Sequence, residues 1–186
     1  MELCEKGSLK DIMKRKGPFS EDDARIIIGQ VIDGVRYLNS RSVIHRDLSD
    51  KNILLTDNKD VKIIDFGMAS QLKDPNEKKH TMCGTANFMA PEVVAGDSYG
   101  FKTDYWGIGC LLYTILVGKP PFDGKGHKEI FTNVSNSDIH FPDSISNEAQ
   151  ELILKLLEKN SNSRVDLIGA LEHPFFRKSK SRLTNA

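Results

Sequence analysis

The sequence has few cysteines and no long hydrophobic run. Its 3 cysteines, Cys4, Cys83 and Cys110, are far apart and form no CxxC pair. An odd number of isolated cysteines favours free thiols in a reducing compartment over disulfides or a zinc site. The longest apolar stretch, residues 106–118, is interrupted by Thr114 and is too short to span a bilayer, so it fits a buried helix.

The sequence also lacks an excess of charge of either sign. Its 26 basic and 26 acidic residues cancel, and 28% of the residues are charged while 39% are apolar. This composition excludes a disordered chain, a collagen-like chain and a polybasic nucleic-acid binder. The first seven residues carry Glu2 and Glu5 and no apolar run, unlike a secretory signal. We therefore expect a soluble, intracellular protein of about one domain.

Helical periodicity dominates the chain, so the fold is predicted to be mainly α. Ser20 and Asp23 form a capping-box-like pair at the start of the longest helical pattern. Apolar spacing predicts helices over residues 9–13, 20–38, 103–117, 146–159 and 165–171, and short strands over 43–44, 53–55 and 61–64. Residues 67–100 show no regular pattern, and no internal repeat is found.

Three short motifs follow one another in the first half of the chain. Residues 45–52 read HRDLSDKN, residues 65–67 read DFG and residues 90–92 read APE. Taken singly, the polar residues Asp47 and Asp65 could simply cap turns. The three motifs together, in this order and spacing, are a strong signal of phosphoryl-transfer chemistry.

This arrangement resembles the eukaryotic protein kinases over nearly the whole sequence. The resemblance implies ATP and Mg²⁺ as cofactors and the large C-terminal lobe of an α+β kinase fold over residues 1–176, followed by a basic tail, 177–186. It implies that Asp47 accepts the proton of the attacking hydroxyl and that Asn52 and Asp65 hold the metal ions. Phosphoryl transfer requires such positioning and charge neutralisation more than covalent chemistry, and Mg²⁺ prefers hard oxygen ligands.

The resemblance also implies structural and nucleotide-binding roles in the same part of the chain. His45 is expected to support the DFG backbone and is not proposed as a base. The backbone of Glu2 and Cys4 would bind adenine, and Leu54 and Ile64 would form the floor beneath it.

Regulation by phosphorylation is a further implication, because Arg46 precedes the catalytic acid and an arginine can bind a phosphate. Thr81 lies where polo-like and related kinases carry their activating site. Thr85 matches the threonine that faces the catalytic acid in serine/threonine kinases and would order the loop. The alternative for both is an ordinary loop threonine.

Three charged residues are expected to hold the large lobe together. Asp104 would anchor the catalytic loop from the buried helix. Glu92 and Arg164 would form a buried ion pair beneath the substrate-docking loop.

Several stretches resemble the Sak-type polo-like kinases, which govern centriole duplication. They are MELCEKGSL, GPFSEDDAR, residues 73–85 and GKPPFD. Ser49 stands where serine/threonine kinases usually carry a lysine, and Sak-type kinases likewise tend to have a small hydroxyl residue there. The resemblance implies protein substrates, no nucleic-acid or membrane partner, and a cytoplasmic location at the centrosome or centriole. It leaves the oligomeric state open.

Two hypotheses about function follow. The first is a serine/threonine kinase of which this sequence is a fragment, since no glycine-rich loop, VAIK-like lysine or partner glutamate precedes the catalytic loop and the small N-terminal lobe is therefore expected to be absent. The second is a non-catalytic, kinase-like binding module. Retention of Asp47, Asn52 and Asp65 favours the first. The basic tail could bind acidic partners or membranes, or could simply be a solvated end.

We predict that residues 1–186 alone bind Mg-ATP weakly and transfer phosphate negligibly, because a lysine–glutamate pair and the metal-holding aspartate must act together. Isothermal titration of this polypeptide with Mg-ATP tests the prediction. Micromolar binding would contradict it.

Overall fold

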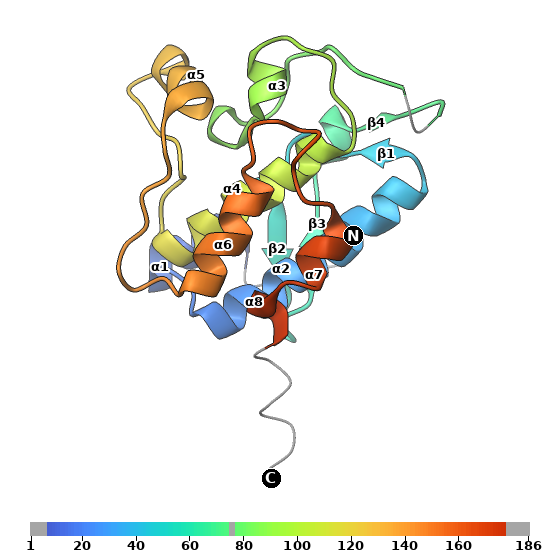
Figure 1. Cartoon of the computed structure of the whole chain (residues 1–186). Coiled ribbons are helices and arrows are strands. Elements are labelled where there is room, and N and C mark those ends of the chain that lie inside the picture. The colour runs from blue at the N-terminus through green and yellow to red at the C-terminus, as the bar shows by residue number, and fades with distance from the viewer. Residues whose placement is uncertain (1–6, 75–76, 178–186) are drawn as a thin grey trace.

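The computed structural model describes residues 7–74 and 77–177 (Figure 1). Its α-helices are α1 (Leu9–Lys16), α2 (Glu21–Ser40), α3 (Pro91–Val94), α4 (Lys102–Val117), α5 (His127–Asn136), α6 (Asn147–Leu156), α7 (Leu167–Leu171) and α8 (Pro174–Arg177). Its strands are β1 (Val43–Ile44), β2 (Ile53–Leu55), β3 (Val61–Ile63) and β4 (Ser70–Gln71), and two short 3₁₀ helices are η1 (Phe66–Met68) and η2 (Ala86–Phe88). The prediction of a mainly helical fold with small strands is confirmed.

Serine side chains cap the first two helices. Ser20 Oγ accepts the N–H of Asp23 at 3.2 Å, which confirms the predicted start of α2. Ser8 forms a full capping box with Asp11 at the start of α1, a feature that the sequence analysis did not identify. Each cap satisfies an N–H group that has no partner within the helix, so the chain enters both helices at a fixed residue.

Helix α4 forms the centre of the core. It packs against α2 on one side and α6 on the other, as Figure 1 shows, and nearly all its residues from Thr103 to Leu116 are buried. A Cβ atom at Gly109 would lie 2.8–2.9 Å from Leu156 and Leu157, so only glycine allows the two helices to approach so closely. The all-round apolar pattern of residues 103–117 was therefore correctly interpreted as an enclosed helix.

Two small antiparallel sheets bring distant segments together. Strand β1 pairs with β4, with Val43 opposite Gln71, and β2 pairs with β3, with Ile53 opposite Ile63. The chain passes from one sheet to the other twice, through residues 45–52 and again through residues 64–69. The two pairings therefore hold the HRD-containing loop and the DFG segment next to each other.

Some predicted elements differ from those observed. The sequence analysis did not predict α5 or α8, and residues 67–100 contain short elements, η1, β4, η2 and α3, where no regular structure was predicted. Ile64 lies outside β3, and α6 ends at Leu156 rather than near Lys159 because the chain turns into the segment that leads to Arg164.

Two further predictions concern the cysteines and membrane-spanning helices, and others fall on residues that the structure does not describe. Cys83 and Cys110 are free thiols, as predicted. Within residues 7–74 and 77–177, no helix is long and apolar enough to cross a bilayer. Glu2, Cys4 and the tail from residue 178 onward lie outside the described residues.

Glu92 and Arg164 form a buried ion pair, in the arrangement that the sequence analysis predicted. The guanidinium donates to both carboxylate oxygens at 2.8 and 2.9 Å, and its side chain is fully buried. Arg164 also donates to the carbonyls of Lys102 and Glu158 and lies over the Trp106 ring. Burial raises the pKa of Glu92, but the bonds and charge of Arg164 outweigh it and hold the pKa below its usual value.

Replacing Arg164 by Met should lower the free energy of unfolding by about 3–5 kcal/mol, because Glu92 would be left buried and unpaired. Since the paired Glu92 has a lowered pKa, its stabilising contribution is present above the unfolded-state pKa of 4.5 and disappears as pH falls through the lower folded-state value. Urea denaturation at pH 7 and at decreasing pH measures both effects.

The double variant Arg164→Met with Glu92→Leu is the control, since replacing both charges by apolar groups removes the stranded carboxylate. It should regain much of the lost stability. Equal losses in the single and the double variants would contradict the proposed energetics.

Candidate active site

Asp47 lies in the loop between β1 and β2 and is held by hydrogen bonds to both carboxylate oxygens. The Asn52 amide donates to Asp47 Oδ2 at 2.8 Å and to the Asp47 carbonyl at 2.9 Å. The backbone N–H of Thr85, far along the chain, donates to Asp47 Oδ1 at 2.8 Å. The carboxylate is thus fixed in orientation by its own loop and by the segment before APE.

The loop is anchored from below by Asp104 of α4. Its carboxylate accepts the backbone N–H of His45 at 2.8 Å and that of Arg46 at 2.9 Å. Asp104 is buried, and burial raises its pKa although both backbone N–H groups act in the opposite direction. Two charge-assisted hydrogen bonds therefore attach the residues just before Asp47 to the central helix.

His45 connects this loop to the DFG segment. Its ring is completely buried, and Nε2 lies 3.0 Å from the carbonyl oxygen of Ile64, immediately before Asp65. The Asp47 N–H donates to the other ring nitrogen, Nδ1, at 3.3 Å. A neutral ring with its proton on Nε2 satisfies both bonds. The Phe66 ring packs edge-on against His45 at 4.9 Å.

Asp65 is exposed and adopts a left-handed backbone conformation, with φ of 61°. Its Oδ1 accepts the N–H of Gly67 at 3.2 Å, which leaves Oδ2 available. The N–H of the preceding Ile64 donates to the Asn52 carbonyl at 3.0 Å. Backbone pairing thus places the DFG segment directly beside the loop that carries Asp47 and Asn52.

Arg46 connects the loop to the segment that follows DFG. Its Nε donates to the Met68 carbonyl, and its Nη1 lies 3.4 Å from the Tyr99 hydroxyl. Tyr99 is buried and its hydroxyl donates to the Thr81 carbonyl at 2.6 Å. Arg46, Tyr99 and Thr81 therefore form a chain of contacts. The sequence analysis identified two of its members and missed Tyr99, which lies in a stretch with no motif of its own.

Leu54 and Ile64, the predicted floor of an adenine site, lie on the same face of the β2–β3 hairpin. Leu54 pairs with Lys62, and Ile64 follows two residues later along the extended chain. Because side chains alternate along a strand, Ile64 and Leu54 share a face. Ile64 is 36% exposed and Leu54 is half-buried, so apolar surface remains available there.

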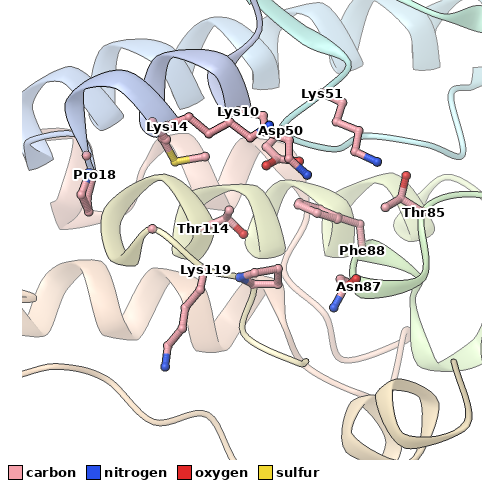
Figure 2. Close-up of a pocket in the computed structure, with 14 residues that line it drawn as sticks. Lys10, Lys14, Pro18, Asp50, Lys51, Thr85, Asn87, Phe88, Thr114 and Lys119 are labelled. Carbon is pink, nitrogen blue, oxygen red and sulfur yellow. The ribbon is translucent and has the colours of Figure 1, made fainter. Parts of the chain in front are cut away.

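Ser49, in the place of the usual lysine, points into the protein. It is completely buried, and its Oγ has no hydrogen-bond partner. The neighbouring Lys51 is exposed and lines a cavity of about 340 Å³ together with Thr85. The sequence analysis did not identify this cavity, because its walls come from α1, the HRD-containing loop (residues 45–52, called the catalytic loop below), η2 and the turn after α4. Figure 2 shows Lys51 and Thr85 at one end and Lys14 and Pro18 at the other.

Known proteins are similar to this sequence over almost its entire length. A family model for the protein kinase domain matches residues 1–176. The chain belongs to the protein kinase family. Serine/threonine-protein kinase PLK4 of Xenopus tropicalis is 46% identical over 94% of this chain and 19% of its own length. PLK4 of Aedes aegypti is 48% identical over 97% of this chain and 24% of its own length.

PLK4 of Nematostella vectensis is 46% identical over 94% of this chain. These relatives confirm the predicted resemblance to Sak-type polo-like kinases. The chain spans about a fifth of the length of these curated relatives.

A substitution at Asp104 tests whether its carboxylate anchors the loop locally. In the Asp104→Ala variant, the N–H groups of His45 and Arg46 lose their acceptor, and each lost bond to a charged group is worth about 1–3 kcal/mol. Their amide protons should exchange with solvent about ten- to a hundredfold faster. Hydrogen exchange followed by NMR measures this change.

Asp97→Ala provides the control, since Asp97 is an exposed aspartate that follows α3. Exchange at residues 45 and 46 should be unchanged in that variant. An equally unchanged exchange in Asp104→Ala would contradict the anchoring role of Asp104.

Proposed function

We propose that this chain is the large catalytic lobe of a serine/threonine protein kinase of the polo-like type, which transfers the γ-phosphate of ATP to serine and threonine hydroxyls of proteins. One observation carries the proposal. Asp47 and Asn52 are hydrogen-bonded at 2.8 Å, and the backbone of the DFG segment is paired to the same loop. A lobe that served only as a scaffold would have no chemical need for this convergence.

Asp47 is the proposed proton acceptor. A general base must lie within hydrogen-bond reach of the hydroxyl that it activates and must keep a fixed orientation. The bonds from Asn52 and from the Thr85 N–H provide that orientation, one to each oxygen. Asp47 would accept the proton of the substrate hydroxyl while the hydroxyl oxygen attacks phosphorus and the ADP oxygen leaves.

Asn52 and Asp65 fit the demands of Mg²⁺. The Asn52 Nδ2 donates to Asp47, which fixes the orientation of the amide and leaves its oxygen to bind the metal ion. Asp65 keeps one carboxylate oxygen beyond its bond to Gly67. Among residues 7–74 and 77–177, no three His, Cys, Asp or Glu side chains form a metal cluster. Mg²⁺ binds through few protein oxygens and shares substrate phosphates. Bound Mg²⁺ would neutralise phosphate charge.

Phosphorylation of Thr81 is the proposed means of control. Tyr99 holds the Thr81 backbone and also contacts Arg46, so a phosphate on Thr81 would lie close to the Arg46 guanidinium. A charge-assisted bond there would link the segment after DFG to the catalytic loop. Thr85 is proposed to order the loop through its N–H on Asp47. Leu54 and Ile64 are proposed to contact adenine.

The subfamily supports a finer proposal about location. The relatives are PLK4 kinases over 94–97% of this chain, and we propose that the whole protein acts in the cytoplasm at the centrosome or centriole. A second candidate is a non-catalytic kinase-like module, because buried Ser49 replaces the usual phosphate-directed lysine, although Sak-type kinases share a small hydroxyl residue at this position. A measurement of phosphate transfer discriminates between the two.

In the natural full-length protein, Asp47→Asn should slow phosphate transfer by about a hundred- to ten-thousandfold, the usual contribution of a positioned base. Asn keeps the size and part of the hydrogen bonding, so the fold should survive. Transfer of ³²P from ATP to casein-type protein substrates at saturating ATP measures kcat. Asp65→Ala should instead weaken the engagement of Mg-ATP and raise its KM.

The exposed Asp97→Asn substitution is the matched control and should leave kcat unchanged. Unchanged turnover in Asp47→Asn would refute the proposed base. Absence of transfer by the unmodified full-length protein would favour the non-catalytic module.

A further inference from the structure

The cavity that Thr85 lines adjoins the proposed catalytic site. Thr85 forms part of its wall, and the N–H of the same residue donates to Asp47 Oδ1 at 2.8 Å. Asp50 and Lys51, from the catalytic loop itself, form another part. A protein segment whose hydroxyl lies at Asp47 would therefore have its neighbouring residues over this cavity.

The walls of the cavity are rich in lysine. Lys10 and Lys14 come from consecutive turns of α1, Lys51 comes from the catalytic loop, and Lys119 lies on the turn after α4 (Figure 2). Within the described residues, no salt bridge engages any of these four lysines. They are therefore available for a ligand.

A single acid, Asp50, lies among these lysines in the cavity wall. It is only 8% exposed, and burial raises its pKa in spite of the nearby Lys10 and Lys51. Counting Asp50 as ionised, the four lysines leave the cavity lining with a net positive charge of three. The cavity therefore attracts an anion near the attacking hydroxyl.

The donors favour a phosphoryl group over a carboxylate. The positively charged groups of the cavity lining are all lysines. Ammonium groups act as single-point donors, and several of them can share the three oxygens of one phosphate. A phosphoryl group also brings a charge of about −1.5 to −2 at pH 7, so it offsets more of the positive charge of the lining than one carboxylate does.

We propose that this cavity binds a phosphorylated side chain of the protein substrate, located within a few residues of the hydroxyl that is to be phosphorylated. The enzyme would thus prefer substrates that another kinase, or an earlier turnover, has already phosphorylated nearby. This inference rests on the proposed kinase function and specifies its substrate class.

A peptide series tests the proposal with the natural full-length protein. Each peptide carries one acceptor serine and a second residue, which is phosphoserine, glutamate or alanine, moved in turn through the four positions on either side. At one or two adjacent positions, phosphoserine should raise kcat/KM at least about tenfold over alanine, with glutamate between them. The ratio should fall with added salt, because Lys14, Lys51 and Lys119 are exposed to solvent.

The Lys14→Glu substitution should reduce the ratio of phosphoserine to alanine peptide to near one. Lys128→Glu, which changes an exposed lysine of α5 outside the cavity, is the matched control and should leave the ratio unchanged.

The outcomes separate the two proposals. Equal kcat/KM for all peptides, or a glutamate peptide as good as the phosphoserine peptide, would overturn the phosphoryl site while the kinase function stands. Loss of the ratio in both lysine variants would also overturn it, because a general effect of charge would then explain the preference. Absence of transfer to every peptide and protein substrate would instead count against the kinase function.

Discussion

The pair of hydrogen bonds from the backbone of His45 and Arg46 to the Asp104 carboxylate is the constraint on which the candidate site depends. Asp104 is buried in α4, the most enclosed helix of the fold. A carboxyl group there is costly to bury unless its oxygens are satisfied, and two backbone donors satisfy them. The same bonds leave Asp47, the next residue, at a fixed distance from the core.

From this anchor the site is built outward by backbone pairing. The two small sheets attach the DFG segment to the catalytic loop, and His45 spans the gap through its ring. Arg46 and Asp65 both adopt positive φ values, 70° and 61°. Non-glycine residues avoid this region at a cost of about 1–2 kcal/mol, so the surrounding bonds must hold them there. Among the four non-glycine residues with positive φ in the described parts of the chain, these two are the neighbour of the proposed base and a proposed metal ligand.

The APE segment and the residues just before it are held by a different set of contacts. The Glu92–Arg164 pair secures the APE segment to the residues after α6, and Asp47 is joined to the segment before APE by the Thr85 N–H. The segments proposed to bind the peptide and to accept the proton are therefore held by connected contacts. The lysine-lined cavity lies next to these segments, so an anion bound there would have a fixed position relative to Asp47.

Much of the fold could be predicted from local patterns. The Ser20 cap, the enclosed helix at 103–117 and the strands near residues 43, 53 and 61 depend on neighbours in the sequence, and the structure confirms them. Helix α5 was missed because it is short and only Ile130 and Val134 are buried, so few apolar positions mark it in the sequence. The capping box of Ser8 was missed although its signal, an acid three residues later, is present in the sequence.

The sequence by itself determined which side chains are proposed to carry the chemistry, because oxygen-bearing residues such as Asp47, Asn52 and Asp65 are set by residue type and by the spacing of their motifs. Tertiary structure alone decided that Tyr99 joins Arg46 to Thr81, that Ser49 points inward, and that Lys14 and Lys51 face one cavity. These residues are far apart along the chain or carry no motif. Their relation arises only when burial of α4 and pairing of the short strands bring their backbones together.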